Sequence, residues 1–352
     1  MKTMNNPQRS FNMNWDKDFE NIEYFASGNF CDVFTAVHQG SQVCLKIPRD
    51  DIESFDDSCE QIEHELNVFK IMTHPNCMQL IGAGHKMHPQ LGKVRFIVLE
   101  FVSGGTWKQK VDLGQKKSML GCGEYKLTYI ERLYLCVQLA SALKYLHNDY
   151  KPGMALVHRD LKPQNVCFTG AGDVKLMDFG LAQLIEPSGE EHKVYAMSGE
   201  TGTLRYMAPE VALSLPYNEK TDVYGFALLA WQMLSLTTPY EGITPNTFER
   251  YVVERNMRPK CPSKWGDELC QLLESCWQAD MHARPAFTHV LNKMNEIYNA
   301  QKEAPPRRRS LSAIFTSKSE IPPPSLQKPL DTDNQINIQN LESQMANNSI
   351  AP

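Results

Sequence analysis

The hydrophobic pattern of this 352-residue chain changes from mainly strand-like to mainly helical at Gly104-Gly105. Before these glycines, residues 22–47 carry short, strand-like apolar runs around the turn-forming sequence HQGSQ. The run VRFIVLEFV (94–102) is continuously apolar, which is typical of a buried strand. Only residues 54–73 have a helical period. The apolar face of this helix would contain Ile62, Leu66, Phe69 and Met72.

After Gly105 the hydrophobic pattern becomes mainly helical. Thr128 and Glu131 form a capping-box signature at the start of a long amphipathic segment. Two further segments, 221–236 and 267–277, also repeat their apolar residues at helical spacing. A β-rich part followed by a helical part predicts an α+β, bilobal architecture.

These patterns predict four parts of the chain. A small β-rich N-lobe with one main helix would span 19–102, and a larger, mainly helical C-lobe would span 106–300, with a hinge between them. Residues 1–18 are polar, and we expect a flexible N-terminal extension. Residues 301–352 contain many Pro, Ser, Asn and Gln residues and few large apolar ones, which predicts a disordered tail.

The composition excludes several classes of protein. The net charge is −5, and no basic face is evident, so we expect no nucleic-acid partner. The sequence shows no signal peptide and no apolar run of about 18 residues, so no membrane span is expected. The ten cysteines are scattered without a CxxC pair, which is typical of reduced core residues. The cytoplasm is the expected location, with the nucleus as an alternative.

Three motifs follow one another in the helical half: HRDLKPQN (158–165), DFG (178–180) and APE (208–210). Each is weak alone, but their order and spacing are specific. With the lysine-bearing run VCLK (43–46), they resemble the eukaryotic protein kinase family over about residues 20–298. The strings GTLRYMAPE, DVYGFALLAWQML and CWQADMHARP resemble its tyrosine-kinase-like (TKL) group. The resemblance implies a bilobal protein kinase fold and an enzyme that uses ATP and Mg²⁺ to phosphorylate protein substrates.

The same resemblance implies roles for five residues. Asp160 would accept the proton of the substrate hydroxyl, while Asn165 and Asp178 would bind Mg²⁺. Lys46 would pair with the α and β phosphates of ATP. Lys162, two residues after the base, is typical of a serine/threonine kinase. Tyrosine or dual specificity stays open.

A buried ammonium group at Lys46 requires an acidic partner. Glu65 lies 19 residues further on, in the amphipathic helix, and is the expected partner. Glu63 is the alternative.

The glycine-rich loop departs from the family pattern G-x-G-x-x-G-x-V. The corresponding residues are Ala26, Ser27, Gly28, Asn29, Phe30, Cys31, Asp32 and Val33. Only the middle glycine is kept, and glycines let the backbone approach phosphates closely. Ala26 and Cys31 therefore predict a tighter or stiffer approach to ATP. This departure motivates the alternative function, a pseudokinase that acts as a scaffold or ATP-binding switch with weak or no catalysis.

The resemblance also implies an adenine pocket. Val33 and Cys44 would lie above the ring and Cys167 below it. Leu99 would be the gatekeeper, followed by the hinge residues Glu100, Phe101 and Val102. An apolar spine would stack through Phe69, Leu80, His158 and Phe179.

Other residues of the C-lobe would support the site. Asp222 would hold the base of the spine, and Glu210 would pair with Arg284. Arg159 beside the catalytic aspartate implies control by phosphorylation of the activation loop, and therefore an upstream activating kinase as a partner. The acceptor candidates in this loop are Ser198 and Thr201, with Tyr195 as a weaker one. Separately, Ser310 in the tail follows three arginines and resembles a target of arginine-directed kinases, although a plain solvated basic run is the alternative. The sequence names neither the substrate, the pathway nor the oligomeric state.

Overall fold

The computed structural model describes residues 9–28, 30–49, 55–112, 127–187, 193–197 and 204–303. All of them belong to one compact unit, Met1–Ala304. The second unit, Pro305–Pro352, lies outside the described residues. Most of the expected disordered tail therefore lies outside them too.

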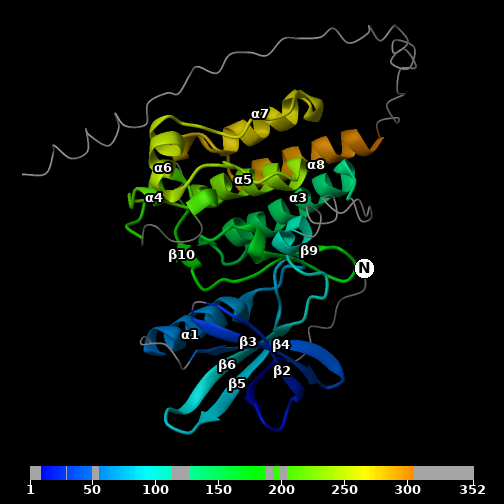
Figure 1. The fold of residues 1–352 in the computed structure, drawn as a ribbon, viewed down its shortest axis with the longest axis vertical. Helices are drawn as coiled ribbons and strands as arrows, with labels where there is room; N and C mark the ends of the chain where they lie inside the picture. Colours follow the sequence, from blue (N-terminus) through cyan, green and yellow to red (C-terminus); the bar gives the residue numbers. More distant parts are fainter. Residues whose placement is uncertain are drawn as a thin grey trace, which may run out of the picture. The chain divides into compact units, whose positions relative to one another are not determined.

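The small lobe contains one six-stranded sheet with the strand order β1-β5-β6-β4-β3-β2 (Figure 1). The β3-β4 hairpin turns at Gln39-Gly40, where both residues have positive φ angles of 49° and 75°. This two-residue turn suits the right-handed twist of the strands. The strands are β1 (Ser10–Asn14), β2 (Glu20–Ser27), β3 (Cys31–His38), β4 (Ser41–Pro48), β5 (Leu80–His88) and β6 (Gly92–Glu100).

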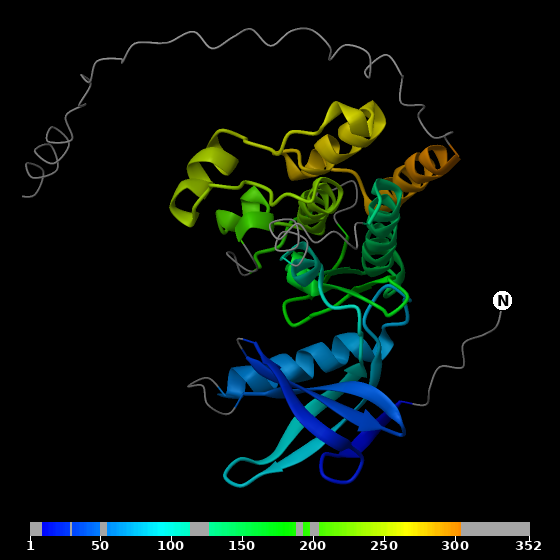
Figure 2. The same ribbon diagram turned by 45° about the vertical axis from the view of Figure 1, so that its right-hand side comes forward.

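One long helix, α1 (Phe55–Ile71), packs against this sheet (Figure 2). The four apolar residues predicted to share its inner face are all buried: Ile62, Leu66, Phe69 and Met72. Their spacing therefore places α1 against strands β4, β5 and β6. A β-rich lobe with one main helix is confirmed.

The expectation of a loose extension over residues 1–18 is wrong for its second half. β1 pairs in parallel with β5, and Met13, Trp15 and Phe19 are buried in the lobe. This pairing is made by backbone hydrogen bonds, which do not depend on the side chains. The five-residue strand, with the sequence SFNMN, therefore shows no apolar period that could have predicted it.

The large lobe is mainly helical, as predicted. α3 begins after the N-cap Thr128, and its capping box is formed by Thr128 and Glu131. Its main helices are α3 (Tyr129–Lys144), α5 (Lys220–Ser235), α7 (Asp267–Cys276) and α8 (Phe287–Glu303). Short elements complete it: β7 (Ala155–Val157), β8 (Val166–Phe168), β9 (Val174–Leu176), β10 (Gln183–Ile185), α4 (Pro209–Ala212) and α6 (Pro245–Phe248).

The last helix extends past the boundary expected at residue 300. α8 continues through Glu303, and the Gln301 side chain donates a hydrogen bond to the carbonyl oxygen of Trp265 at 3.3 Å. The start of the expected tail is therefore part of the C-lobe. Among the helices of the described residues, none is long and apolar enough to cross a membrane.

Candidate active site

Three charged side chains from three elements converge between the lobes. Lys46 on β4 places its Nζ atom 2.6 Å from Glu65 Oε2 on α1 and 3.2 Å from Asp178 Oδ1. Burial opposes the charge of Lys46, but Asp178 and Glu65 outweigh it and raise its pKa above the ordinary value. Lys46 in turn lowers the pKa of Asp178. Both groups are therefore charged at neutral pH.

The alternative partner of Lys46 is excluded by the geometry. Glu63 Oε1 accepts a hydrogen bond from Arg95 Nε at 2.8 Å, on the other side of α1. Residues two positions apart in a helix, such as Glu63 and Glu65, point about 200° apart around its axis, so they cannot face the same partner.

The Asp178-Phe179 segment is packed inward. The Phe179 ring centroid lies 5.3 Å from Phe69 and 5.0 Å from His158, and the Phe179 amide donates to Glu65 Oε1 at 3.3 Å. Asp178 has a φ angle of 65°, in the left-handed region. This conformation is energetically unfavourable for residues other than glycine, and the packing of Phe179 stabilises it. The segment therefore turns the Asp178 carboxylate toward Lys46.

Asp222 on α5 anchors residues 158–165, which carry the HRDLKPQN motif and are here called the catalytic loop. Its carboxylate accepts hydrogen bonds from the amide of His158 at 2.7 Å, from the amide of Arg159 at 2.9 Å, and from His147 Nε2 at 2.9 Å. Burial alone would raise the pKa of Asp222, but these partners outweigh it and lower the pKa. They also stabilise the loop where Arg159 has a φ angle of 68°.

Asp160, Lys162 and Asn165 form one hydrogen-bonded group. The Lys162 ammonium donates to Asp160 Oδ2, and Asn165 Nδ2 donates to the same oxygen at 3.0 Å. Asp160 Oδ1 is buried and has no hydrogen-bond partner among the described residues. One carboxylate oxygen is thus held in place, and the other is left as a free acceptor that could take a proton.

Asn165 also connects this group to the Asp178 segment. Its carbonyl oxygen accepts a hydrogen bond from the Met177 amide at 3.0 Å, next to Asp178 in the chain. Because Asn165 Nδ2 is used by Asp160, the amide oxygen is the atom left for a ligand.

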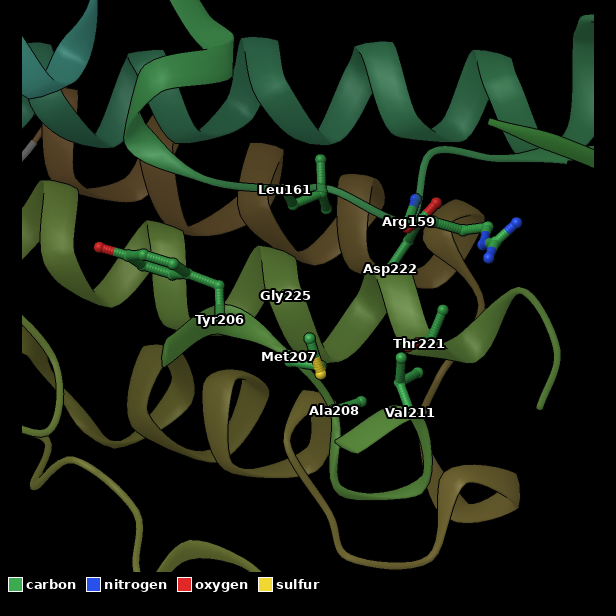
Figure 3. Close-up of a pocket in the computed structure, with 9 residues that line it drawn as sticks. All are labelled: Arg159, Leu161, Tyr206, Met207, Ala208, Val211, Thr221, Asp222 and Gly225. Atoms are coloured by element: carbon green, nitrogen blue, oxygen red, sulfur yellow. The ribbon is translucent and has the colours of Figure 1, made fainter. Parts of the chain in front are cut away.

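A cavity of about 20 Å³ lies behind the catalytic loop (Figure 3). It is too small for a substrate and has roughly the size of one water molecule. A Cβ atom at Gly225 would lie only 3.2 Å from Leu161 Cβ, so glycine there allows the loop to approach α5 closely. The residues that line this cavity are Arg159, Leu161, Tyr206, Met207, Ala208, Val211, Thr221, Asp222 and Gly225.

The residues predicted to line the adenine pocket lie on strands of both lobes. Cys44 pairs with Leu99 between β4 and β6, and it lies on the same face of β4 as Lys46. Burial raises the pKa of Cys44 to about 11 and that of Cys167 to about 12, with a smaller contribution of Cys44 to the latter. These two thiols are therefore neutral, and they suit an apolar ring. Val102 is partly buried against the main core.

The predicted hinge residue Glu100 is fixed from the C-lobe. Its Oε1 atom accepts hydrogen bonds from Lys175 Nζ at 2.6 Å and from the Gln79 amide at 2.9 Å. The backbone amide of Glu100 donates to the carbonyl oxygen of Gln79 at 3.0 Å. The hinge therefore has a defined position relative to β9, which leads to Asp178.

The altered glycine-rich loop is a tight hairpin. The Gly28 amide donates to the carbonyl oxygen of Cys31 at 2.8 Å, and Ser27 Oγ donates to Asp32. Cys31 is buried, whereas Ala26 and Ser27 are exposed on the edge strand β2. Phe30 is 37% exposed. Asn29 lies outside the described residues.

One further expectation about the C-lobe can be assessed. Arg284 and Glu210 form a bidentate ion pair, with distances of 2.6 and 2.9 Å. This predicted pair is confirmed. The expected phosphorylation sites Ser198, Thr201 and Ser310 lie outside the described residues.

Several residues that shape the site had no sequence signal. His147 and Lys175 contact Asp222 and Glu100, but their partners are 75 residues away in each case. Neither spacing nor periodicity connects positions so far apart. Only the polarity of Lys175 in the otherwise apolar run VKL could have drawn attention to it.

A bilobal fold with these converging groups defines the protein kinase class. A family model described as protein tyrosine and serine/threonine kinase matches residues 19–294. The chain therefore belongs to the protein tyrosine and serine/threonine kinase family, and the resemblance drawn from the sequence is confirmed.

Curated relatives carry related names. The chain is 32% identical to the serine/threonine-protein kinase VIK of Arabidopsis thaliana over 283 residues, which cover 80% of this chain and 60% of the relative. It is 30% identical to the serine/threonine-protein kinase STY46 of the same plant, over 80% of this chain and 45% of the relative. The chain is also 28% identical to the serine/threonine/tyrosine-protein kinase HT1 of this plant, over 87% of this chain and 74% of the relative. The chain thus spans about half the length of the first two relatives.

Proposed function

We propose that this protein is an ATP-dependent protein kinase that transfers the γ-phosphoryl group of Mg-ATP to serine and threonine hydroxyls of proteins. The observation that supports it most is the convergence of Lys46 with Glu65 and Asp178, at 2.6 and 3.2 Å. A pseudokinase of this family would be expected to have lost this lysine pair, and here the pair is intact. The remaining acidic group, Asp160, has one oxygen without a partner among the described residues.

The residues present fit a magnesium ion. Carboxylate and amide oxygens are the ligands that Mg²⁺ prefers. The Asp178 side chain is 37% exposed, and Asn165 has its amide nitrogen engaged by Asp160, so both can offer an oxygen. When bound, Mg²⁺ would neutralise charge on the phosphates of ATP.

Each of the protein groups has a distinct task in this proposal. Lys46, fixed by Glu65, holds the α and β phosphates. Asp160 accepts the proton of the substrate hydroxyl at its unpaired Oδ1 atom, while Lys162 holds Oδ2 and stabilises charge on the transferred group. Phosphoryl transfer needs little more than this positioning and charge compensation.

The adenine end is proposed to bind between the lobes. Val33 and Cys44 would cover one face of the ring and Cys167 the other, with Leu99 at the back and Glu100 and Val102 along the hinge. The glycine-rich loop, residues 26–31, would cover the phosphates.

A protein substrate is favoured over a small metabolite. A cavity of about 370 Å³ beside the APE motif (208–210) is lined by Leu204, Met207 and Phe248, among others. Asn246 and Glu249 line it beside these apolar residues, so it suits a peptide side chain with both apolar and polar parts. Serine/threonine specificity is supported by Lys162 and by the names of the relatives VIK and STY46. The name of HT1 keeps dual specificity as the alternative.

We propose the cytoplasm as the location, with the nucleus as the alternative, and a role in signalling. An upstream kinase that phosphorylates the activation loop is the proposed partner, because Arg159 lies next to the catalytic base. The net charge of −5 argues against a nucleic-acid partner.

The proposal is tested by the Asp160→Asn variant. With Mg-ATP and a generic protein substrate, turnover should fall about 10²- to 10⁴-fold, because the proton acceptor is lost. Phosphoamino-acid analysis of the product should give phosphoserine and phosphothreonine. The exposed Asp149→Asn variant is the control, and it should keep full turnover. Nucleotide binding without turnover in the unmodified protein would instead support the pseudokinase alternative.

A further inference from the structure

A strap formed by residues 9–19, here called the N-terminal strap, lies almost entirely before the region matched by the family. β1 in this strap is one of the two edge strands of the sheet and pairs with β5. A Cβ atom at Gly82 or Gly84 would overlap the backbone oxygens of Ser10 and Met13. The two glycines of β5 therefore provide the close approach that β1 needs.

The far end of the strap is held by aromatic packing. The Trp15 ring centroid lies 5.4 Å from Phe34 and 5.2 Å from Phe96, in edge-on geometry. Lys86 Nζ covers the same ring at 4.7 Å from its centroid. Such contacts are favourable, so the strap is anchored at both β1 and Trp15.

This anchoring places Arg9 at the C-terminal end of α1. The guanidinium donates hydrogen bonds to the carbonyl oxygens of Phe69 at 3.3 Å, of Lys70, and of Met72 at 2.7 Å. The last carbonyl groups of a helix have no partner inside the helix, and they carry the negative end of its dipole. A planar cation with several donors suits this position better than any other side chain.

The end of α1 that Arg9 contacts is connected to the catalytic groups. Glu65, which holds Lys46, lies one turn before Phe69, whose ring packs on Phe179. From the C-lobe, Tyr150 Oη donates to the carbonyl oxygen of Val68 at 2.9 Å. The C-terminal end of α1 is thus held by Arg9 of the strap and by Tyr150 of the C-lobe.

We propose that Arg9 is a positioning residue, which holds α1 in the orientation that brings Glu65 to Lys46. The inference rests on the proposed kinase function for its consequence, but the contact itself does not depend on catalysis. When Arg9 is removed, α1 is expected to rotate and open more often, which lowers the fraction of molecules with an intact Lys46–Glu65 pair.

The experiment compares Arg9→Ala, Arg9→Lys and the control Arg255→Ala in the full chain. Amide hydrogen exchange of α1 should become about 10-fold faster in Arg9→Ala, with other helices unchanged. The kcat/KM value should fall by about 2-fold or more but by less than the exchange rises, because catalysis follows the fraction of molecules with α1 closed and exchange follows the open fraction. Arg9→Lys keeps the charge without the planar fork, and should recover part of both effects. Arg255, exposed at the end of the 249–254 helical turn, should have neither effect.

The outcomes separate the inference from the proposed function. Unchanged exchange of α1 in Arg9→Ala overturns the inference, whatever the activity. A loss of activity that accompanies faster exchange throughout the chain also overturns it, because that result indicates general destabilisation. If the unmodified protein has no kinase activity, the proposed function fails, while the exchange comparison still decides whether Arg9 holds α1.

Discussion

Single carboxylates in this protein have very different tasks because their partners differ. Asp222 accepts three hydrogen bonds inside the C-lobe, whereas Asp160 keeps one oxygen without a partner among the described residues. A fully paired carboxylate stabilises structure, and a half-paired one can exchange a proton with a ligand. The number of donors around each residue therefore separates the anchor from the proposed base.

Asp222→Asn should destabilise the protein more than a surface charge change. The amide would place an NH₂ group against donors at His158, Arg159 or His147, so at least one buried donor would lose its acceptor. We expect a loss of about 2–4 kcal/mol in the free energy of unfolding, measured by urea denaturation. The exposed pair of Asp149 with Lys144 gives the control, since Asp149→Asn should cost less than about 1 kcal/mol. Equal losses for both variants would contradict the anchor role.

Elements of this fold begin and end at residues whose local chemistry is visible in the sequence. α3 starts at a capping box, in which the Thr128 amide donates to Glu131 Oε2 at 2.6 Å and the Glu131 amide donates to Thr128 Oγ1 at 3.3 Å. The helix then packs against α8 and α5 and carries little of the active site itself. Stability and catalysis should therefore be separable at this cap.

Thr128→Ala should lower the free energy of unfolding by about 1 kcal/mol, because the first turn of α3 loses its side-chain acceptor. The kcat/KM value for protein phosphorylation should stay within about twofold of the unmodified protein. Thermal and urea unfolding measure the first quantity, and steady-state kinetics the second. Thr128→Ser keeps the hydroxyl and should behave like the unmodified protein. A large loss of activity in Thr128→Ala would mean that α3 positions the site directly.

At the scale of the whole molecule, the segment between α1 and β5 joins the two lobes by hydrogen bonds, in addition to the hinge in the chain. The Leu176 amide on β9 donates to the carbonyl oxygen of Asn76 at 2.8 Å, and Asn76 Nδ2 donates to the carbonyl oxygen of Val174 at 3.0 Å. His74 in this segment contacts α3, where its Nε2 atom lies 3.2 Å from Ser141 Oγ. Its ring stacks on Tyr145 with a centroid distance of 5.1 Å.

Acid should loosen this connection through His74. Burial lowers the pKa of His74 to about 4; Lys175 and Lys144 act in the same direction, and Asp149 opposes them. The unfolded chain therefore binds the proton first as the pH falls. The stability from neutral His74 is complete above about pH 6.5 and is lost toward pH 4. After a discount for the partly exposed ring, we expect a loss of about 1–2 kcal/mol in this window.

The His74→Asn variant isolates this contribution. The Asn side-chain oxygen can replace His74 Nδ1 as the acceptor for the Asn76 amide, which lies 3.1 Å from it, but it does not titrate. Urea unfolding between about pH 7 and pH 5 should therefore show a smaller pH dependence in the variant than in the unmodified protein. The same slope in both proteins would exclude His74 as the titrating group.

The sequence alone was sufficient for the parts of this protein that depend on local pattern. A period near two or near 3.6 decides which side chains share a face, so the strands β2, β3, β4 and β6 and the helices α1, α3, α5 and α7 were predictable. The motifs around Asp160 and Asp178 were recognisable because phosphoryl transfer requires fixed chemical groups at fixed spacing. The need of Lys46 for an acidic partner followed from the cost of burying an unpaired ammonium group, with Glu65 expected and Glu63 as the alternative.

Only the tertiary structure decided which distant elements meet. It excluded Glu63 by turning it toward Arg95, and it placed His147 and Lys175 at Asp222 and Glu100. It also made residues 10–14 an edge strand, and it brought Arg9 to the end of α1. A local period specifies the face that a side chain occupies, but the partner across that face is set by packing and backbone hydrogen bonds between segments far apart in the chain.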